Sequence, residues 1–239
     1  MKKLTTIKDT NFAIILVYLM TLFIALSIQL ISLLVIDQDG LSEPGLITFS
    51  AMMNFIAYAI QAGVLIHIFK TFLFKNQWVL FKHHLRFSIY LIMIALYLMF
   101  TFLVLAQGFF LMTDTDPISP NQAVLEAIME SGVWYNVLSL FIIAVILAPI
   151  VEELVYRKAI YGLIQQYAHP VFAVLGSAFL FALIHVVIDL GNAIYIVPYF
   201  GLGLVLAFIY YYSGRMLFVS IFAHALMNLY TFILLFSNL

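Results

Sequence analysis

The chain of 239 residues is too apolar for a soluble globular domain, since 66% of its residues are hydrophobic, 9% are charged and the mean hydropathy is +1.15. At about 20 apolar residues per crossing, this length allows about seven membrane-spanning helices and little else. The formal net charge of -1 excludes a polybasic nucleic-acid binder, and the lack of cysteine excludes disulfides and thiol chemistry. We therefore expect an all-α, polytopic transmembrane helix bundle.

Seven apolar runs are long enough to cross a bilayer as helices. The first follows Lys2, Lys3 and Lys8, exceeds the length of a signal-peptide core and lacks an evident cleavage site, so we expect it to be retained. The fourth contains Pro149, which predicts a kink or an interfacial continuation. In chain order the runs are 11–36, 46–69, 87–112, 133–168, 171–190, 193–212 and 216–237.

The segments between these runs alternate in the sign of their charge. Because basic loops stay on the cytoplasmic side, the pattern predicts a cytoplasmic N-terminus. Compact loops without organelle signals favour a bacterial cell membrane as the location. The basic segments hold Lys2, Lys3 and Lys8, then Lys70, Lys75, Lys82 and Arg86, then Arg157, Lys158 and Arg215; the acidic ones hold Asp37, Asp39 and Glu43, then Asp114, Asp116, Glu126 and Glu130.

Two local patterns predict structural details. Ser119, Pro120 and Gln122 have the spacing of an N-cap, a first-turn proline and a capping-box partner, which predicts a short interfacial helix over 121–130. Small residues in the fifth and sixth runs predict close helix approach. These are Gly176, Ala178, Gly201 and Gly203.

In the first half of the chain every Asp, Glu, Lys and Arg lies in a loop or at a helix end, whereas charged and histidine side chains fall within or at the edge of the apolar runs in the second half, where an unpaired charge costs about 3 kcal/mol or more. Glu153 and Arg157 are four residues apart and can pair along one helix face, which leaves Glu152, rotated by about 100°, free to face a cavity. His224 and Asn228 also lie one turn apart, and the fifth run supplies His185. Three helices can thus bring polar groups together.

A carboxylate beside an imidazole can remove a proton from water, which indicates hydrolysis. A second histidine followed by Asn228 would offer donors to the oxyanion of a tetrahedral intermediate. Alternatively, Glu152, His185 and His224 would hold a zinc ion that activates water. The residues alone leave both mechanisms open.

The segment from Ala148 to Arg157 contains Glu-Glu-x-x-x-Arg and resembles the first motif of the CAAX prenyl endopeptidase and bacteriocin-processing family, also called Abi. The second family motif, Phe-x-x-x-His, is similar to Phe181 to His185, and the third, His-x-x-x-Asn, to His224 to Asn228. The resemblance covers about 135–239, the last four spans. It divides the chain into N-terminal transmembrane helices and loops (1–134) and a peptidase core (135–239).

The resemblance implies an intramembrane endopeptidase in which Glu152 and His185 activate water and His224 and Asn228 stabilise the oxyanion. Glu153, Arg157 and Phe181 take supporting roles. A metal-free mechanism that requires no cofactor is favoured, with zinc as the alternative, because the chain has no His-Glu-x-x-His pair. Tyr156 and Lys158 depart from the family pattern, which commonly has Phe and a small residue there.

Other intramembrane proteases fit less well. A rhomboid-like site needs Gly-x-Ser-Gly, and an aspartyl site needs two embedded Asp residues where only Asp189 comes near a span. The expected partners are membrane lipids and a peptide or membrane-protein substrate, with a role in peptide maturation or bacteriocin self-immunity. The alternatives are a catalytically silent immunity or scaffold protein of the same fold and a proton pathway, although the polar residues cluster rather than spread across the bilayer.

Overall fold

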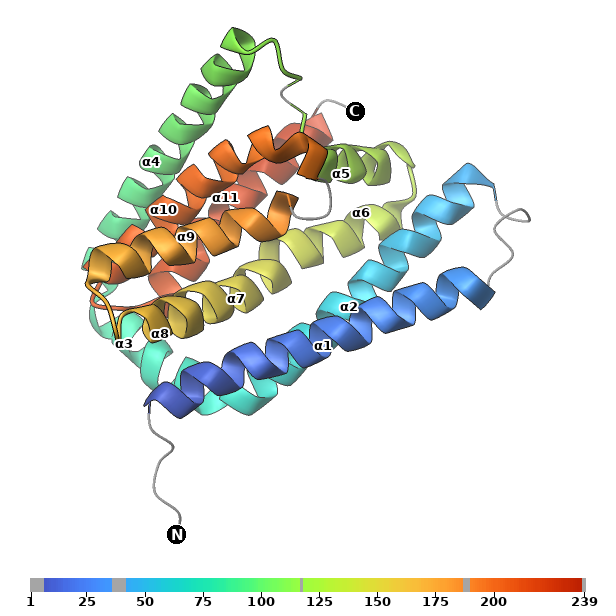
Figure 1. Ribbon diagram of the computed structural model, residues 1–239. Coiled ribbons are helices and arrows are strands. Elements are labelled where there is room, and N and C mark those ends of the chain that lie inside the picture. The colour runs from blue at the N-terminus through green and yellow to red at the C-terminus, as the bar shows by residue number, and fades with distance from the viewer. Residues whose placement is uncertain (1–6, 36–41, 117, 187–189, 238–239) are drawn as a thin grey trace.

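The computed structural model describes residues 7–35, 42–116, 118–186 and 190–237, and these residues form helices joined by short turns, with no strand among them (Figure 1). Within these described ranges, six helices are long and apolar enough to cross a membrane. A seventh apolar helix, α9 (Pro170–Val186), has 17 residues, near the lower limit for a crossing. The chain is a multi-pass membrane protein with the expected all-α fold. Lys2, Lys3, Asp37, Asp39 and Asp189 lie outside the described residues, as do the side chains of Lys8 and Glu43.

The spans follow the expected order along the chain. Most are single helices, whereas the fourth is a continuous stack of short helical segments over Trp134–Ile164. The single helices are α1 (Ile7–Val35), α4 (Leu85–Met112), α10 (Ile196–Tyr212) and α11 (Leu217–Ser237), and the second span begins with α2 (Glu43–Lys70). The fourth span consists of α6 (Trp134–Phe141), η2 (Ile142–Leu147), α7 (Ala148–Glu152), η3 (Glu153–Tyr161) and α8 (Gly162–Ile164).

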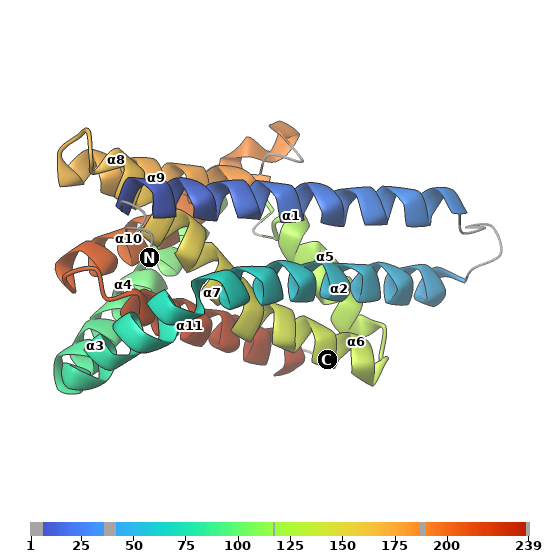
Figure 2. The ribbon, with the colours of Figure 1, turned by 90° about the horizontal axis from the view of Figure 1, so that it is seen from below.

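The second span runs further than the sequence predicts. The expected loop after residue 69 is helical, because α2 continues through the π-helical segment η1 (Thr71–Gln77) and α3 (Trp78–His83). Aromatic contacts hold this extension, since the Trp78 ring lies 5.5 Å from Phe81 and 5.1 Å from Phe218. Gln77 Oε1 also accepts a 2.7 Å hydrogen bond from the Leu217 amide, which caps the first turn of α11. Figure 2 shows the chain changing direction between α2 and α3.

Pro149 does not end the fourth span. The helix passes through it, and π-helical segments with wider i→i+5 turns lie on both sides of α7. Pro149 has no N–H to donate, and the wider turns rearrange the backbone hydrogen bonds around it. They also change which side chains share one face of the helix. Glu152 ends α7 and Glu153 begins η3, so the predicted site lies at one of these transitions.

The expected short helix is present as α5 (Pro120–Glu130). Ser119 Oγ accepts a 3.2 Å hydrogen bond from the Gln122 amide, which confirms the predicted N-cap. The Gln122 side chain donates to Glu126 Oε1 at 3.0 Å, one turn further along the same helix.

Helices α9 and α10 lie side by side next to the fourth span (Figures 1 and 2). Their approach is close at Gly203, where an added Cβ would lie 3.0 Å from the Ala178 carbonyl oxygen and 3.1 Å from Phe181 Cδ1. This confirms the close approach predicted from the small residues. It also places α10 against Phe181, the first residue of the second predicted motif.

We expect Gly203→Leu to lower the free energy of unfolding by about 1–3 kcal/mol, because an enlarged side chain must push α10 away from α9. Gly108→Leu is the matched control, since nothing lies within 4 Å of a Cβ added there. Thermal unfolding in detergent measures both variants. Equal unfolding midpoints for the two would contradict the close packing.

Candidate active site

Glu153 forms a fully buried ion pair with Arg157. Glu153 Oε2 lies 3.0 Å from Arg157 Nε, one helical turn away, and both side chains are 0% exposed. Arg157 Nη1 also donates to Ser177 Oγ at 3.3 Å, and the Ser177 hydroxyl donates to the Tyr156 carbonyl at 2.8 Å. The predicted pairing is present, and Ser177 joins it to α9. Nothing in the sequence pattern pointed to Ser177.

The two glutamates face the two nitrogens of one imidazole. His224, in α11, has its Nδ1 3.0 Å from Glu153 Oε1, while its Nε2 lies 3.8 Å from Glu152 Oε2. Because a carboxylate oxygen accepts, Nδ1 donates in the first contact. The first contact fixes the ring, and the second is too long for a direct hydrogen bond. Glu152 keeps a side chain that is 13% exposed, whereas Glu153 is enclosed.

Phe181 is the centre of the aromatic contacts around this network. Its ring lies 4.7 Å from the His185 ring and 5.8 Å from the His224 ring, and the Arg157 guanidinium carbon lies 4.9 Å from it. The Tyr156 ring meets Phe181 edge to face at 5.4 Å. The Phe181 ring therefore contacts both predicted histidines and the cation of the ion pair.

The His185 ring has one polar contact within its own helix and a stacking contact with α10. Its Nδ1 lies 2.7 Å from the Phe181 carbonyl oxygen, so Nδ1 is the donor, and in a neutral ring this makes Nε2 the acceptor. The Tyr199 ring stacks on the imidazole with centroids 4.5 Å apart and planes at 21°. The motifs did not include Tyr199, because its contact arises from helix packing.

Asn228 points toward the fourth span. Its Nδ2 donates a 2.8 Å hydrogen bond to the Ala144 carbonyl in η2, two turns before Glu152 on the same continuous helix. One N–H of the amide is used in this bond, and the amide has a second. The four residues predicted to be catalytic thus come from the fourth span, α9 and α11.

The part of the chain that contains the three motifs matches a known protein family. Residues 134–230 match the model of the type II CAAX prenyl endopeptidase Rce1-like family. The predicted family resemblance is confirmed. The Bacillus subtilis (strain 168) protein named "Putative membrane peptidase YdiL" is 32% identical to this chain over 114 residues, which are 48% of this chain and 42% of that protein. The chain thus matches less than half the length of this relative, and no solved structure matches it.

The two positions that depart from the Rce1-like pattern have distinct surroundings. Tyr156 is buried and packs against Phe181, as a phenylalanine would. Lys158 faces α1, where its Nζ donates to Asn11 Oδ1 at 2.8 Å, and it lies 5.1 Å from the centre of the Phe72 ring. Lys158 therefore ties the Rce1-like segment to the N-terminal helices.

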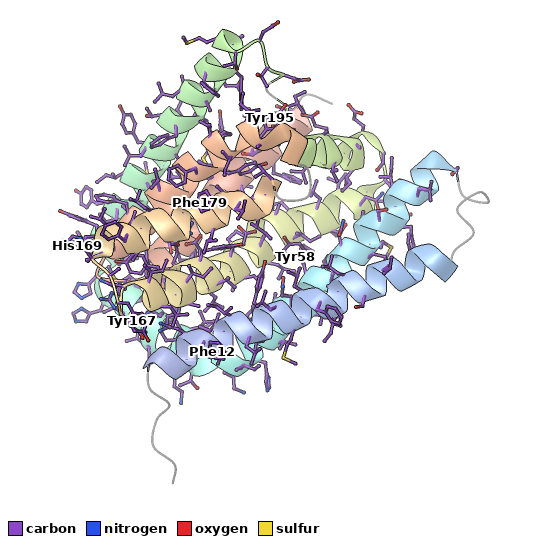
Figure 3. The ribbon with its side chains drawn as sticks, in the orientation of Figure 1. Phe12, Tyr58, Tyr167, His169, Phe179 and Tyr195 are labelled. Carbon is purple, nitrogen blue, oxygen red and sulfur yellow. The ribbon has the colours of Figure 1, made fainter. Side chains whose placement is uncertain are left out.

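The N-terminal helices also approach Glu152. Tyr18 in α1 and Tyr58 in α2 lie close enough to interact electrostatically with its carboxylate, and Figure 3 places Tyr58 between α2 and the fourth span. These phenols come from outside the matched segment and carry no motif. Sequence reasoning had no signal with which to find them.

The remaining described histidines lie elsewhere. His67, His83, His84 and His169 are exposed, and Figure 3 shows His169 at the end of the molecule where α8 leads into α9. Among the described residues, no three His, Cys, Asp or Glu side chains are arranged to hold a metal ion. The alternative ligand set of Glu152, His185 and His224 is therefore not gathered around one point.

Arg157→Met should lower the free energy of unfolding by about 3–5 kcal/mol, because it leaves the Glu153 carboxylate buried without its cation. Adding Glu153→Gln should recover part of this loss by removing the orphaned charge. Arg86→Met is the control, since Arg86 is exposed and such changes stay within about 0.5 kcal/mol. Thermal unfolding in detergent measures all three proteins. If Arg157→Met unfolded like Arg86→Met, the ion pair would have no structural role.

Proposed function

We propose that this protein is an intramembrane endopeptidase that hydrolyses a peptide bond of a membrane-associated peptide or protein. The observation that carries the proposal is the arrangement of Glu153 and Glu152 around the two nitrogens of His224. The similarity of residues 134–230 to the Rce1-like family supports it. In this proposal 135–239 acts as the peptidase core, and 1–134 supplies transmembrane helices that enclose it.

Glu152 is the proposed general base. Its side chain is less enclosed than that of Glu153, and among the described residues no Lys or Arg pairs with it as Arg157 pairs with Glu153. It takes one proton from a water molecule while His185 Nε2, the free acceptor of that ring, orients the water. The water oxygen then bonds to the carbonyl carbon of the scissile peptide.

His224 and Asn228 are the proposed oxyanion donors. In this role His224 is the imidazolium, in which both nitrogens carry a proton, so Nδ1 donates to Glu153 and Nε2 donates to the oxyanion. The Asn228 amide has one N–H beyond its bond to Ala144. As the carbonyl re-forms, the carbon–nitrogen bond breaks. The proton held by Glu152 then passes to the leaving nitrogen, which restores the carboxylate.

The proposed mechanism requires no metal. Zinc remains the alternative, and it would need Glu152, His185 and His224 to converge on one ion. Each imidazole uses Nδ1 in a bond to protein, His224 to Glu153 Oε1 and His185 to the Phe181 carbonyl, so Nε2 is the nitrogen that each would offer to zinc. Insensitivity of cleavage to a zinc chelator would agree with the metal-free proposal, and restoration of chelated enzyme by added zinc would replace it.

We further propose that the protein acts in a bacterial cell membrane with its N-terminus in the cytoplasm. Peptide maturation and bacteriocin self-immunity are the roles that the family resemblance suggests. A substrate in the membrane suits a site whose residues come from the fourth span, α9 and α11 and whose histidines pack against the aromatic rings of Phe181 and Tyr199. The catalytically silent immunity or scaffold protein is the competing outcome of the test below.

Glu152→Ala should abolish the release of specific peptides from host membranes, with a loss of at least about 100-fold, because general-base catalysis supplies that much. His185→Ala should remove the same peptides. Mass spectrometry of peptides from membranes with wild-type or variant protein measures the effect and identifies the substrate by its new termini.

Glu130→Ala is the matched control, a glutamate replaced at an exposed position of α5. It should leave the peptides unchanged. If no peptide depended on Glu152 while the variant still restored the phenotype of a deletion strain, the scaffold or immunity function would take the place of the endopeptidase.

A further inference from the structure

His185 lies where its own helix gives limited support. It is the second-last residue of α9, whose described part ends at Val186. Its Nδ1 bond to the Phe181 carbonyl fixes one edge of the ring, and the Phe181 ring is tilted by 47° against it. A catalytic imidazole needs a defined plane as well as a defined edge, because proton transfer depends on the direction of its Nε2 lone pair.

Tyr199 supplies a second support for this ring. The near-parallel contact at 4.5 Å covers the His185 imidazole with a flat aromatic face from α10. The hydroxyl of Tyr199 lies 3.1 Å from Ser119 Oγ, which is buried and caps α5. The side chain is thus fixed at its ring by His185 and at its hydroxyl by Ser119, 80 residues earlier in the chain.

A second tyrosine makes a separate contact with the segment before α5. Tyr195 lies one turn before Tyr199 and donates to the Asp116 carbonyl at 2.8 Å, while its ring meets Phe110 in α4. Figure 3 shows Tyr195 at the end of α10 that approaches α5. The two phenols bind Asp116 and Ser119 in the segment before α5, but the ring contact with His185 belongs to Tyr199.

We propose that Tyr199 is a positioning residue for His185, which it holds by ring stacking while Ser119 anchors its hydroxyl. The role rests on the proposed endopeptidase activity. It assigns a function to α10 and to the cap of α5, neither of which carries a catalytic motif. Tyr199 acts through the imidazole and needs no contact with the substrate.

Tyr199→Leu should lower kcat by about 10- to 100-fold and leave KM within about twofold, because it misdirects a proton acceptor without removing a binding group. Tyr199→Phe keeps the stacked ring and loses only a neutral hydrogen bond, so kcat should fall by less than about tenfold. The substrate is the peptide whose termini depend on Glu152. Tyr195→Phe is the control and should retain wild-type kcat, since it removes a similar phenol bond that does not contact His185.

A spectroscopic measurement tests the positioning without a substrate. The full chain in detergent is labelled with ¹⁵N and ¹³C histidine, and the His185 signals are assigned with His185→Gln. The wild-type protein and Tyr195→Phe should show one Nδ1–H tautomer of neutral His185. Tyr199→Leu should show a mixture of tautomers for His185, while the His224 signals stay unchanged and report an intact site.

The outcomes separate this inference from the proposed function. If Glu152→Ala abolishes cleavage but Tyr199→Leu keeps wild-type kcat and a single His185 tautomer, the positioning role is wrong and the endopeptidase stands. If cleavage does not depend on Glu152, the endopeptidase fails, and the tautomer measurement alone decides whether Tyr199 holds the imidazole. A Tyr199→Leu protein with shifted His224 signals would contradict a role confined to His185.

Discussion

The site depends on one buried carboxylate, Glu153, which is shared between Arg157 and His224. A charge inside a membrane domain is costly unless it is paired and hydrogen-bonded, so this carboxylate must use both of its oxygens. Oε2 pairs with Arg157 in the same helix, and Oε1 reaches His224 in α11. Arg157 therefore neutralises the carboxylate within its own helix, while the bond of the other oxygen to His224 joins this helix to α11 and sets the orientation of the imidazole.

Because only Glu153 pairs with Arg157 and His224, the two adjacent glutamates differ in burial and in hydrogen bonding. Glu153 is closed in by its two partners, whereas Glu152 keeps some exposure and approaches the other nitrogen of His224 without bonding to it. Neighbouring residues on a helix point about 100° apart, yet both reach one ring because the two imidazole nitrogens lie on different edges. Glu153 is thus held by two partners, and Glu152, the proposed general base, is the more exposed of the two. Phe181 connects this network to α9, since its ring contacts Arg157, His185 and His224.

Several features of this arrangement could be predicted from the sequence. Hydrophobic run length gave the helix bundle, and the four-residue spacing of Glu153 and Arg157 gave their pairing, because both depend on local geometry. Ser119 as the cap of α5 is local in the same sense. The extension of α2 to His83 was missed because lysines in that segment suggested a loop, whereas Trp78 and Phe81 hold it as a helix through contacts with α11.

The remaining contacts join residues that are distant in sequence. The bond of His224 to Glu153 spans 71 residues, and nothing in their spacing distinguishes it from a contact with Glu152. Tyr199 reaches His185 across the contact between α9 and α10, which also includes the close approach at Gly203, and no motif records this contact. Tyr18 and Tyr58 come from helices outside the segment that matches the family. The catalytic roles of Glu152, His185, His224 and Asn228 remain predictions.

A double-mutant cycle between Glu153 and His224 tests the shared carboxylate most directly. Glu153→Gln, His224→Gln and the double variant are unfolded in detergent, and their free energies of unfolding are compared with that of the wild-type protein. Hydrogen bonds to charged groups contribute about 1.5–3 kcal/mol, so we predict a coupling energy of at least about 1 kcal/mol. Additive effects, within about 0.5 kcal/mol, would show that the two side chains are energetically independent and would contradict the account.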